Sequence, residues 1–163
     1  MFKYKTEVST LPEVKVFTPE PYTDYRGTMW TYWESSMDTP QSKISKFTRS
    51  RKNVLRGLHG DNETWKHITC VYGAFYLVVV DYDKDSPTYL EWDSFTLDDK
   101  NCKSVLVPPG FLNGHLCLSD ECVFHYTQSY PNEYIDWQDQ ISVKWNDPML
   151  KINWPIDNPI LSE

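Results

Sequence analysis

Three basic side chains of different chemistry lie close together in the segment Asn53–Asp81: Arg56, His59 and Lys66. A guanidinium can bind an anion, an imidazole can move a proton, and an ammonium can stabilise a developing oxyanion. Taken singly, each is more often a solvated charge or a hydrogen-bonded structural histidine. Residues of equal parity on a strand share one face, however, so two neighbouring extended segments can direct such groups into one cavity. The trio therefore indicates a site for an anionic ligand and proton transfer.

The elements that position this trio are expected to be short strands. The chain has 163 residues, of which 15% are aromatic, with 11 prolines but only 6 glycines. This composition favours short strands with stiff connections over helices. Turn signals separate strand-like runs at intervals of roughly ten residues, as in a β-barrel of the double-sheet kind. The runs include Met29–Trp33, Leu77–Val80, Tyr89–Leu97, Ser104–Val107 and Glu121–Tyr126. We expect residues 1–163 to form one all-β domain, with a turn or short helix in Tyr134–Gln140.

Charge and cysteine content exclude several classes of protein. The net charge of −7 disfavours a nucleic-acid partner, because binding phosphate backbones requires a basic face, although a local pocket for one nucleotide remains compatible with it. The four cysteines form no CxxC pair and no zinc-ligand spacing. No apolar run has the length of a membrane span, and no secretory segment opens the chain. We expect a cytoplasmic protein with reduced thiols that does not associate with a membrane.

Two further basic features have both a structural and a functional interpretation. The run Lys43–Lys52 is either a solvated strand edge or a contribution of Arg49, Ser50 or Arg51 to a pyrophosphate pocket. Arg26 lies in a turn before an aromatic strand. It is either solvated or able to reach an anionic ligand, on its own subunit or on a neighbouring one.

Short motifs follow one another in order over nearly the whole chain. They are Asp24-x-Arg26-Gly27, Asn53–His59, Lys66, Val80-Asp81, Asp85–Thr88, Pro108-x-Gly110-Phe111, Trp145–Pro148, Ile152-x-Trp154-Pro155 and Leu161-Ser162. Together they resemble the nucleotide-sugar 3,5-epimerases typified by dTDP-4-dehydrorhamnose 3,5-epimerase. The resemblance implies a cupin, that is, a double-stranded β-helix or jelly roll. It also implies a homodimer that needs no metal and no other cofactor.

A closer similarity is to the branch of this family that acts on GDP-linked 4-keto-heptoses in bacterial capsule biosynthesis. The shared motifs are His59-Gly60-Asp61, Thr69–Gly73, Asn113-x-His115 and Asp139-Gln140. This similarity implies a 4-keto sugar linked to GDP or dTDP as the substrate. The nucleotide base, and the choice between hexose and heptose, stay open at this point.

The resemblance also implies a role for individual residues. A ketone at C4 acidifies the C–H bonds at C3 and C5, so a base can remove either proton to give an enolate. By resemblance His59 is that base, oriented by Asp147 in a histidine–carboxylate dyad. Lys66 would hold the O4 enolate, Arg56 would bind near the sugar or phosphate, and Arg26 would reach the nucleotide. Further expected substrate contacts are Glu34, Ser50, Asn113, His115 and Tyr130.

The chain departs from the family pattern at the proton donor. The family has a tyrosine three residues before a threonine, and Thr127 places that position at Phe124, whose ring has no proton to donate. Tyr126 lies two residues further on and shares the face of Phe124, so it is the first substitute. His125 points to the other face, while His115 or water could also approach. Inversion at C3 alone is therefore an alternative to double epimerisation, and a non-catalytic binding cupin is a further one.

Two other cupin activities fit the sequence poorly. A metal-dependent dioxygenase requires a His-x-His pair, but Gly60-Asp61 follows His59. A 3,4-ketoisomerase of the same fold would carry additional histidines beside the first, and these are missing. Epimerisation without a metal remains the favoured function.

Overall fold

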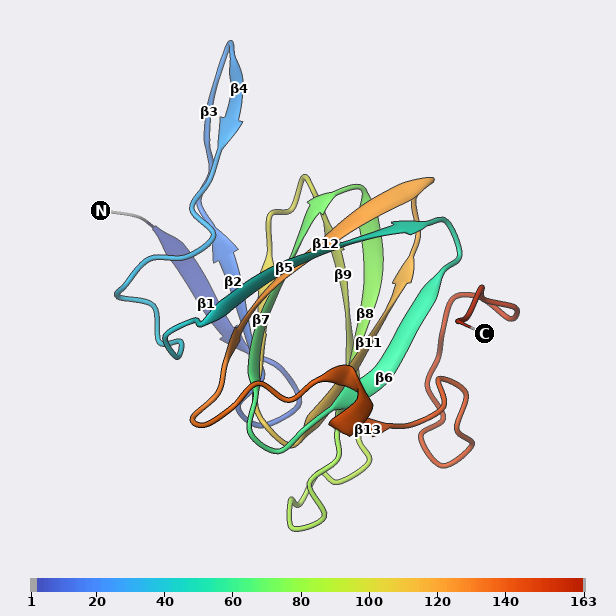
Figure 1. The fold of residues 1–163 in the computed structure, drawn as a ribbon. Coiled ribbons are helices and arrows are strands. Elements are labelled where there is room, and N and C mark those ends of the chain that lie inside the picture. Colours follow the sequence, from blue (N-terminus) through green and yellow to red (C-terminus); the bar gives the residue numbers. More distant parts are fainter. Residues whose placement is uncertain (1–2, 163) are drawn as a thin grey trace.

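Two antiparallel sheets face each other and form a flattened barrel (Figure 1). The computed structural model describes residues 3–162. The larger sheet has the order β1 (Tyr4–Val8), β2 (Lys15–Pro19), β10 (Ser104–Val107), β7 (Trp65–Tyr72), β12 (Glu121–Ser129) and β5 (Ile44–Arg51). The smaller sheet has the order β13 (Ile141–Ser142), β6 (Leu55–Gly60), β11 (Phe111–Cys117), β8 (Ala74–Asp81) and β9 (Trp92–Asp98). The all-β cupin jelly roll predicted from the sequence is confirmed.

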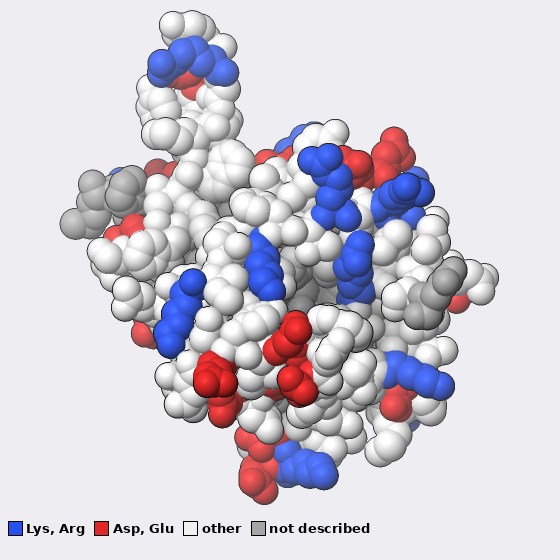
Figure 2. Space-filling view, in the orientation of Figure 1, with Lys and Arg blue, Asp and Glu red and all other residues white. Residues whose placement is uncertain are grey.

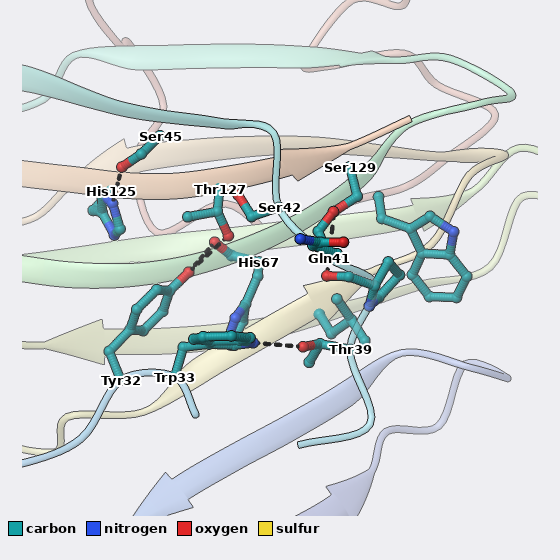
Figure 3. A pocket seen from close by; sticks show the side chains of 13 residues that line it. Tyr32, Trp33, Thr39, Gln41, Ser42, Ser45, His67, His125, Thr127 and Ser129 are labelled. Atoms are coloured by element: carbon teal, nitrogen blue, oxygen red, sulfur yellow. Dashed lines mark hydrogen bonds between the residues drawn. The ribbon is translucent and has the colours of Figure 1, made fainter. Parts of the chain in front are cut away.

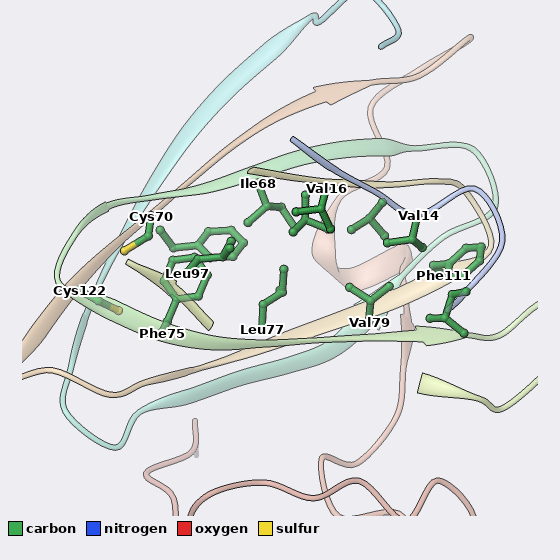
Figure 4. Packing of buried hydrophobic residues seen from close by; sticks show 14 of the residues in the cluster. Val14, Val16, Ile68, Cys70, Phe75, Leu77, Val79, Leu97, Phe111 and Cys122 are labelled. Carbon is green, nitrogen blue, oxygen red and sulfur yellow. The ribbon is translucent and has the colours of Figure 1, made fainter. Parts of the chain in front are cut away.

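Strand β8 shows why these sheets pack as they do. Leu77 and Val79 point into the barrel toward Ile68 of the larger sheet and form the main core (Figure 4). Val78 and Val80 point the other way and pack in a second cluster that includes Leu150 of the C-terminal tail. Both faces of β8 are therefore covered, which explains its nearly continuous apolar sequence.

The N-terminal region and the tail contain the least regular elements. Strands β3 (Tyr22–Asp24) and β4 (Gly27–Met29) form a hairpin that projects from the barrel (Figure 1). The strand predicted for Met29–Trp33 is thus wrong, because residues after Met29 leave the pairing and form a loop. The short helix η1 (Trp137–Asp139) confirms the turn or helix expected near the C-terminus. No helix within residues 3–162 has the length and apolar character needed to cross a bilayer.

Gly57 allows the backbones of the paired strands β6 and β11 to approach closely at the site described below. Its φ is +125°, and a Cβ added there would lie 2.4 Å from the Cα of Gly114. The pairing of β6 with β11 shifts register at the same place, between Asn113 and His115. Neither backbone can retreat easily, because both strands belong to the same sheet.

We expect Gly57→Ala to lower the free energy of unfolding by about 3 kcal/mol, because it combines left-handed strain with a backbone collision. Urea unfolding measures this change. Gly27→Ala is the matched control: Gly27 has a φ of +134° but nothing within 4 Å of its added Cβ, so strain of about 1 kcal/mol is expected. Equal losses in the two variants would contradict the close approach of β6 and β11.

Candidate active site

A cavity of about 270 Å³ opens between the two sheets at one end of the barrel. The larger sheet contributes Lys46, Thr48, Lys66, Phe124, Tyr126 and Gln128 to its wall. The smaller sheet contributes Arg56, His59, Asn113 and His115, and the segment 134–140 lies at the mouth. Lys and Arg side chains stand on both sides of a hollow in this face (Figure 2). The basic trio from the central segment therefore does converge on one cavity.

His59 reaches the cavity from β6, the strand that pairs with both β11 and β13. Burial lowers the pKa of His59 to about 4, and the nearby charge of Lys66 adds to this effect. The imidazole is therefore neutral at pH 7 and has a lone pair available to accept a proton. Among residues 3–162 its ring has no hydrogen-bond or ion-pair partner, so that lone pair is free for a substrate.

Asp147 does not form the predicted dyad with His59. Within the described chain no hydrogen bond or ion pair joins the two, and the carboxylate of Asp147 accepts the backbone N–H of Met149 at 2.9 Å. Asp147 is one turn from Leu150, which packs with Leu58 on the outer face of the smaller sheet. Since Leu58 and His59 are consecutive on a strand, they point to opposite faces, which separates the acid from the imidazole.

Lys66 lies on β7 and crosses the barrel to the smaller sheet. Its Nζ donates a hydrogen bond of 2.9 Å to Oδ1 of Asn113, and the residue is only 6% exposed. Burial lowers the pKa of Lys66 to about 8, while the charge of the buried Asp61 works in the opposite direction. The ammonium is therefore charged at neutral pH in surroundings that shield it from water. Such a group is suited to stabilising an oxyanion.

Phe124 occupies the donor position with an apolar ring. It stacks on His115 with ring centroids 4.1 Å apart and 14° between the planes. Burial lowers the pKa of His115 to about 3, and its Nε2 is buried without a partner. His115 is thus a neutral residue of the cavity wall whose free nitrogen is buried.

Tyr126 and His125 lie on opposite faces of β12, as strand alternation predicts. Tyr126 lines the cavity, and its ring contacts that of Phe124 edge-on at 5.3 Å. Burial raises the pKa of Tyr126, so its hydroxyl keeps its proton at neutral pH. His125 faces outward and shares a hydrogen bond of 2.8 Å with Ser45. Tyr126 is therefore placed to donate a proton and His125 is not.

The basic run in β5 divides between the two faces of its strand. Ser50 is buried and its Oγ accepts a 3.0 Å hydrogen bond from Nε of Arg56, so Ser50 orients that guanidinium rather than lining the cavity. Arg49 points outward, 3.6 Å from Glu121. Lys46 and Thr48 line the cavity. The sequence analysis missed these two residues. Since alternate residues of a strand share a face, their spacing of two and four residues from Ser50 could have indicated them.

Besides Ser50, three further residues predicted to contact substrate lie outside the cavity wall. Arg26 is on the projecting hairpin and donates to the carboxylate of Asp24 at 2.6 Å. Glu34 accepts the backbone N–H of Ser36 at 3.0 Å. Tyr130 packs near Tyr134, with ring centroids 6.1 Å apart. Within one subunit, none of these three belongs to the site.

A second cavity, of about 420 Å³, lies on the outer face of β5, β7 and β12 beneath the segment 32–42 (Figure 3). Tyr32 and His67 stack there at 4.4 Å, and the Tyr32 hydroxyl donates to the carbonyl of His67. It contains none of the residues predicted to be catalytic. We therefore place the candidate active site in the smaller, more charged cavity inside the barrel.

Comparison with known proteins identifies the family to which the chain belongs. The family described as dTDP-4-dehydrorhamnose 3,5-epimerase matches residues 8–163. The chain belongs to this family. It is 34% identical to the dTDP-4-dehydrorhamnose 3,5-epimerase of Shigella flexneri over an alignment of 168 positions, which covers 98% of this chain and 90% of the relative. It is therefore an epimerase of nucleotide-linked sugars.

Two solved structures of related enzymes show the same fold. The dTDP-6-deoxy-D-glucose-3,5-epimerase RmlC from Legionella pneumophila, in complex with dTDP-4-keto-L-rhamnose, has a TM-score of 0.91 and 28% identity, covering 98% of this chain and 88% of that one. ChmJ, a 3'-monoepimerase from Streptomyces bikiniensis in complex with dTDP-quinovose, has a TM-score of 0.86 and 26% identity, covering 95% and 82%. Enzymes of this fold thus include both double and single epimerases.

Proposed function

We propose that this chain inverts C3, C5 or both in a dTDP-linked 4-keto sugar, within bacterial polysaccharide sugar biosynthesis. The observation that carries the proposal is the placement of His59 and Tyr126 on opposing sheets, with the buried ammonium of Lys66 in the same cavity. A sugar ring held between the sheets then has a base on one side and an acid on the other. Residues 1–163 act as a single cupin epimerase domain without a cofactor.

The proposed mechanism uses one proton transfer on each face of the sugar. His59 removes the proton from the carbon next to the C4 ketone, and the electron pair moves to O4. The ammonium of Lys66 stabilises the enolate oxygen, where the negative charge gathers. Tyr126 then donates a proton to the same carbon from the opposite face, which inverts its configuration. Arg56 binds the phosphates, and Asn113 and His115 complete the sugar contacts.

Of the two nucleotides that the sequence left open, GDP and dTDP, we propose dTDP. The relatives that define the family are named for dTDP sugars, and the two neighbouring structures contain dTDP-linked ligands. The GDP-heptose and capsule assignment made from the sequence has no support among them. We further propose a homodimer, in which Arg26, Glu34 and Tyr130 would reach a nucleotide bound to the partner subunit.

Inversion at C3 alone is the second candidate. Phe124 removes the hydroxyl that the family uses, so the donor must act from the position of Tyr126. A donor displaced in this way could reach one carbon and not the other. The similarity to the 3'-monoepimerase ChmJ supports this candidate. A non-catalytic binding protein is less well supported, because His59 and Lys66 both line the cavity.

The proposed function is tested by hydrogen exchange. The protein is incubated with a dTDP-linked 4-keto-6-deoxyhexose in deuterated water, and products are followed by mass and proton spectra. Deuterium at both C3 and C5 of inverted product would identify a double epimerase, and deuterium at one carbon a monoepimerase. No exchange with dTDP- or GDP-linked 4-keto sugars would refute the proposed function.

The pKa values of two site residues predict the pH dependence of the reaction. His59 must be neutral to accept a proton, so kcat/KM should fall below pH of about 4. Lys66 must be charged to hold the enolate, so kcat/KM should also fall above pH of about 8. Steady-state rates across this range measure both limbs. An acid limb at the ordinary histidine value of 6.5 would show that His59 is not held neutral by burial.

A further inference from the structure

Lys46 lies directly opposite the proposed proton donor. In the antiparallel pairing of β5 with β12, Lys46 is the partner of Tyr126, so both side chains leave the sheet on the same face. Both line the active-site cavity, as does Tyr134. The Nζ of Lys46 donates a hydrogen bond to the hydroxyl of Tyr134 and lies 4.3 Å from the centroid of its ring. Two tyrosines and one ammonium thus form a cluster on the side of the cavity opposite His59.

We propose that Lys46 is a positioning residue for the proton donor: its ammonium stabilises the phenolate left on Tyr126 and, through Tyr134, restores the donor's proton from water. This inference rests on the proposed function. It extends the function by explaining how the reaction works although the usual donor position holds Phe124. The phenyl ring of Phe124 packs on His115 and can take no part in the transfer.

The electrostatic surroundings of the cluster favour this role. Burial raises the pKa of Tyr126, and the charge of Lys46 is what opposes that effect, while Tyr134 adds to it. The pKa of Lys46 is itself raised, first by its hydrogen bond to Tyr134 and then by Tyr126, Tyr134 and Asp136, against some desolvation. Lys46 therefore stays cationic where the enzyme is expected to work. Without a nearby cation, burial would disfavour the charged phenolate.

The proton count closes over one turnover. His59 gains one proton from the substrate carbon, and Tyr126 loses one to the other face of that carbon. The ammonium of Lys46 then gives a proton to the phenolate, and the resulting amine regains one from the hydroxyl of Tyr134. Tyr134 is 37% exposed, so it can recover its proton from water, while the imidazolium of His59 releases one. No oxidant, metal or other reactant is needed.

The inference is tested with Lys46→Met in deuterated water, using a dTDP-linked 4-keto-6-deoxyhexose. Two readouts are separated: deuterium that enters the substrate without inversion, which reports His59, and formation of the inverted sugar, which reports the donor. We expect the first to stay within about threefold of wild type and the second to fall about 10²-fold. Lys46→Arg keeps the charge but cannot relay a proton, so it should recover only part of the inversion, whereas Tyr134→Phe should slow inversion and move its alkaline limb.

Lys43→Met is the matched control, because Lys43 also lies over a tyrosine ring, that of Tyr130 at 4.7 Å, but does not line the cavity. It should leave the ratio of the two readouts unchanged. Normal inversion in Lys46→Met, or an equal loss of both readouts in a variant that melts at the wild-type temperature, would overturn the inference. Absence of any exchange in the wild-type protein would instead refute the proposed function itself.

Discussion

Replacing His59 by Asn is expected to reduce both deuterium incorporation and inversion by about 10³-fold, because the neighbouring imidazole of His115 has its free nitrogen buried, which leaves His59 to accept the carbon-bound proton. Asn keeps a polar side chain of similar reach, so binding of the nucleotide sugar should change little. The loss should therefore appear in kcat rather than in the dissociation constant. Single-turnover exchange and ligand titration measure the two separately.

His125→Asn provides the matched control for this substitution. His125 is also a largely buried histidine on a strand of the barrel, but it faces outward and bonds to Ser45. Its replacement should leave the exchange rate near that of wild type. If His59→Asn retained exchange, or if His125→Asn lost as much, the base would have to be assigned to another residue.

The substitution Asp147→Asn distinguishes the dyad predicted from the sequence from the geometry seen in the structure. A carboxylate that braces His59 would make Asp147→Asn cost about 10²-fold or more in kcat. In the structure this carboxylate instead accepts a hydrogen bond from the backbone N–H of Met149. We therefore expect the kcat of Asp147→Asn to stay within about threefold of wild type. A large loss would mean that the C-terminal tail rearranges around bound substrate.

The strand faces of the site could be predicted from the sequence, but contacts between sheets could not. Alternation correctly separated Tyr126 from His125 and favoured an all-β jelly roll. The Lys66–Asn113 hydrogen bond depends on how two sheets stack, and residues 47 apart in sequence carry no local signal of that distance. Asp147 failed for a related reason, since a motif gives the presence of a residue but not the face on which a tail packs.

Lys46 illustrates a different limit. Within a basic run of ten residues, a solvated strand edge was a reasonable interpretation, and only the pairing with β12 reveals that alternate members face the cavity. The projecting hairpin is the opposite case: Arg26 was selected by its motif, but the pairing of β3 with β4 places it away from the barrel. Sequence reasoning therefore identified residue types better than it placed them.

Lys66→Met is expected to reduce inversion by about 10²- to 10³-fold while making the folded protein more stable. The ammonium is the group proposed to stabilise the negative charge on the enolate oxygen. Its loss therefore removes an interaction that forms only as that charge develops. Met fills a similar volume without the cost of burying a charge, which the lowered pKa of Lys66 puts at about 3 kcal/mol. Loss of the hydrogen bond to Asn113 offsets about 1–2 kcal/mol of that gain. Activity and urea unfolding, measured on the same preparation, test both halves.

The gain in stability should depend on pH in a definite direction. Burial lowers the pKa of Lys66 from its ordinary 10.5 to about 8, so between these values the unfolded chain binds more protons than the folded one. Wild-type stability must then rise with pH across this interval, and the advantage of Lys66→Met should shrink accordingly. Lys66→Arg is the control that keeps a charge: it should stay less stable than Lys66→Met throughout and retain part of the activity. A pH-independent difference between wild type and Lys66→Met would mean that the ammonium is not desolvated, and its role at the enolate oxygen would lose its physical basis.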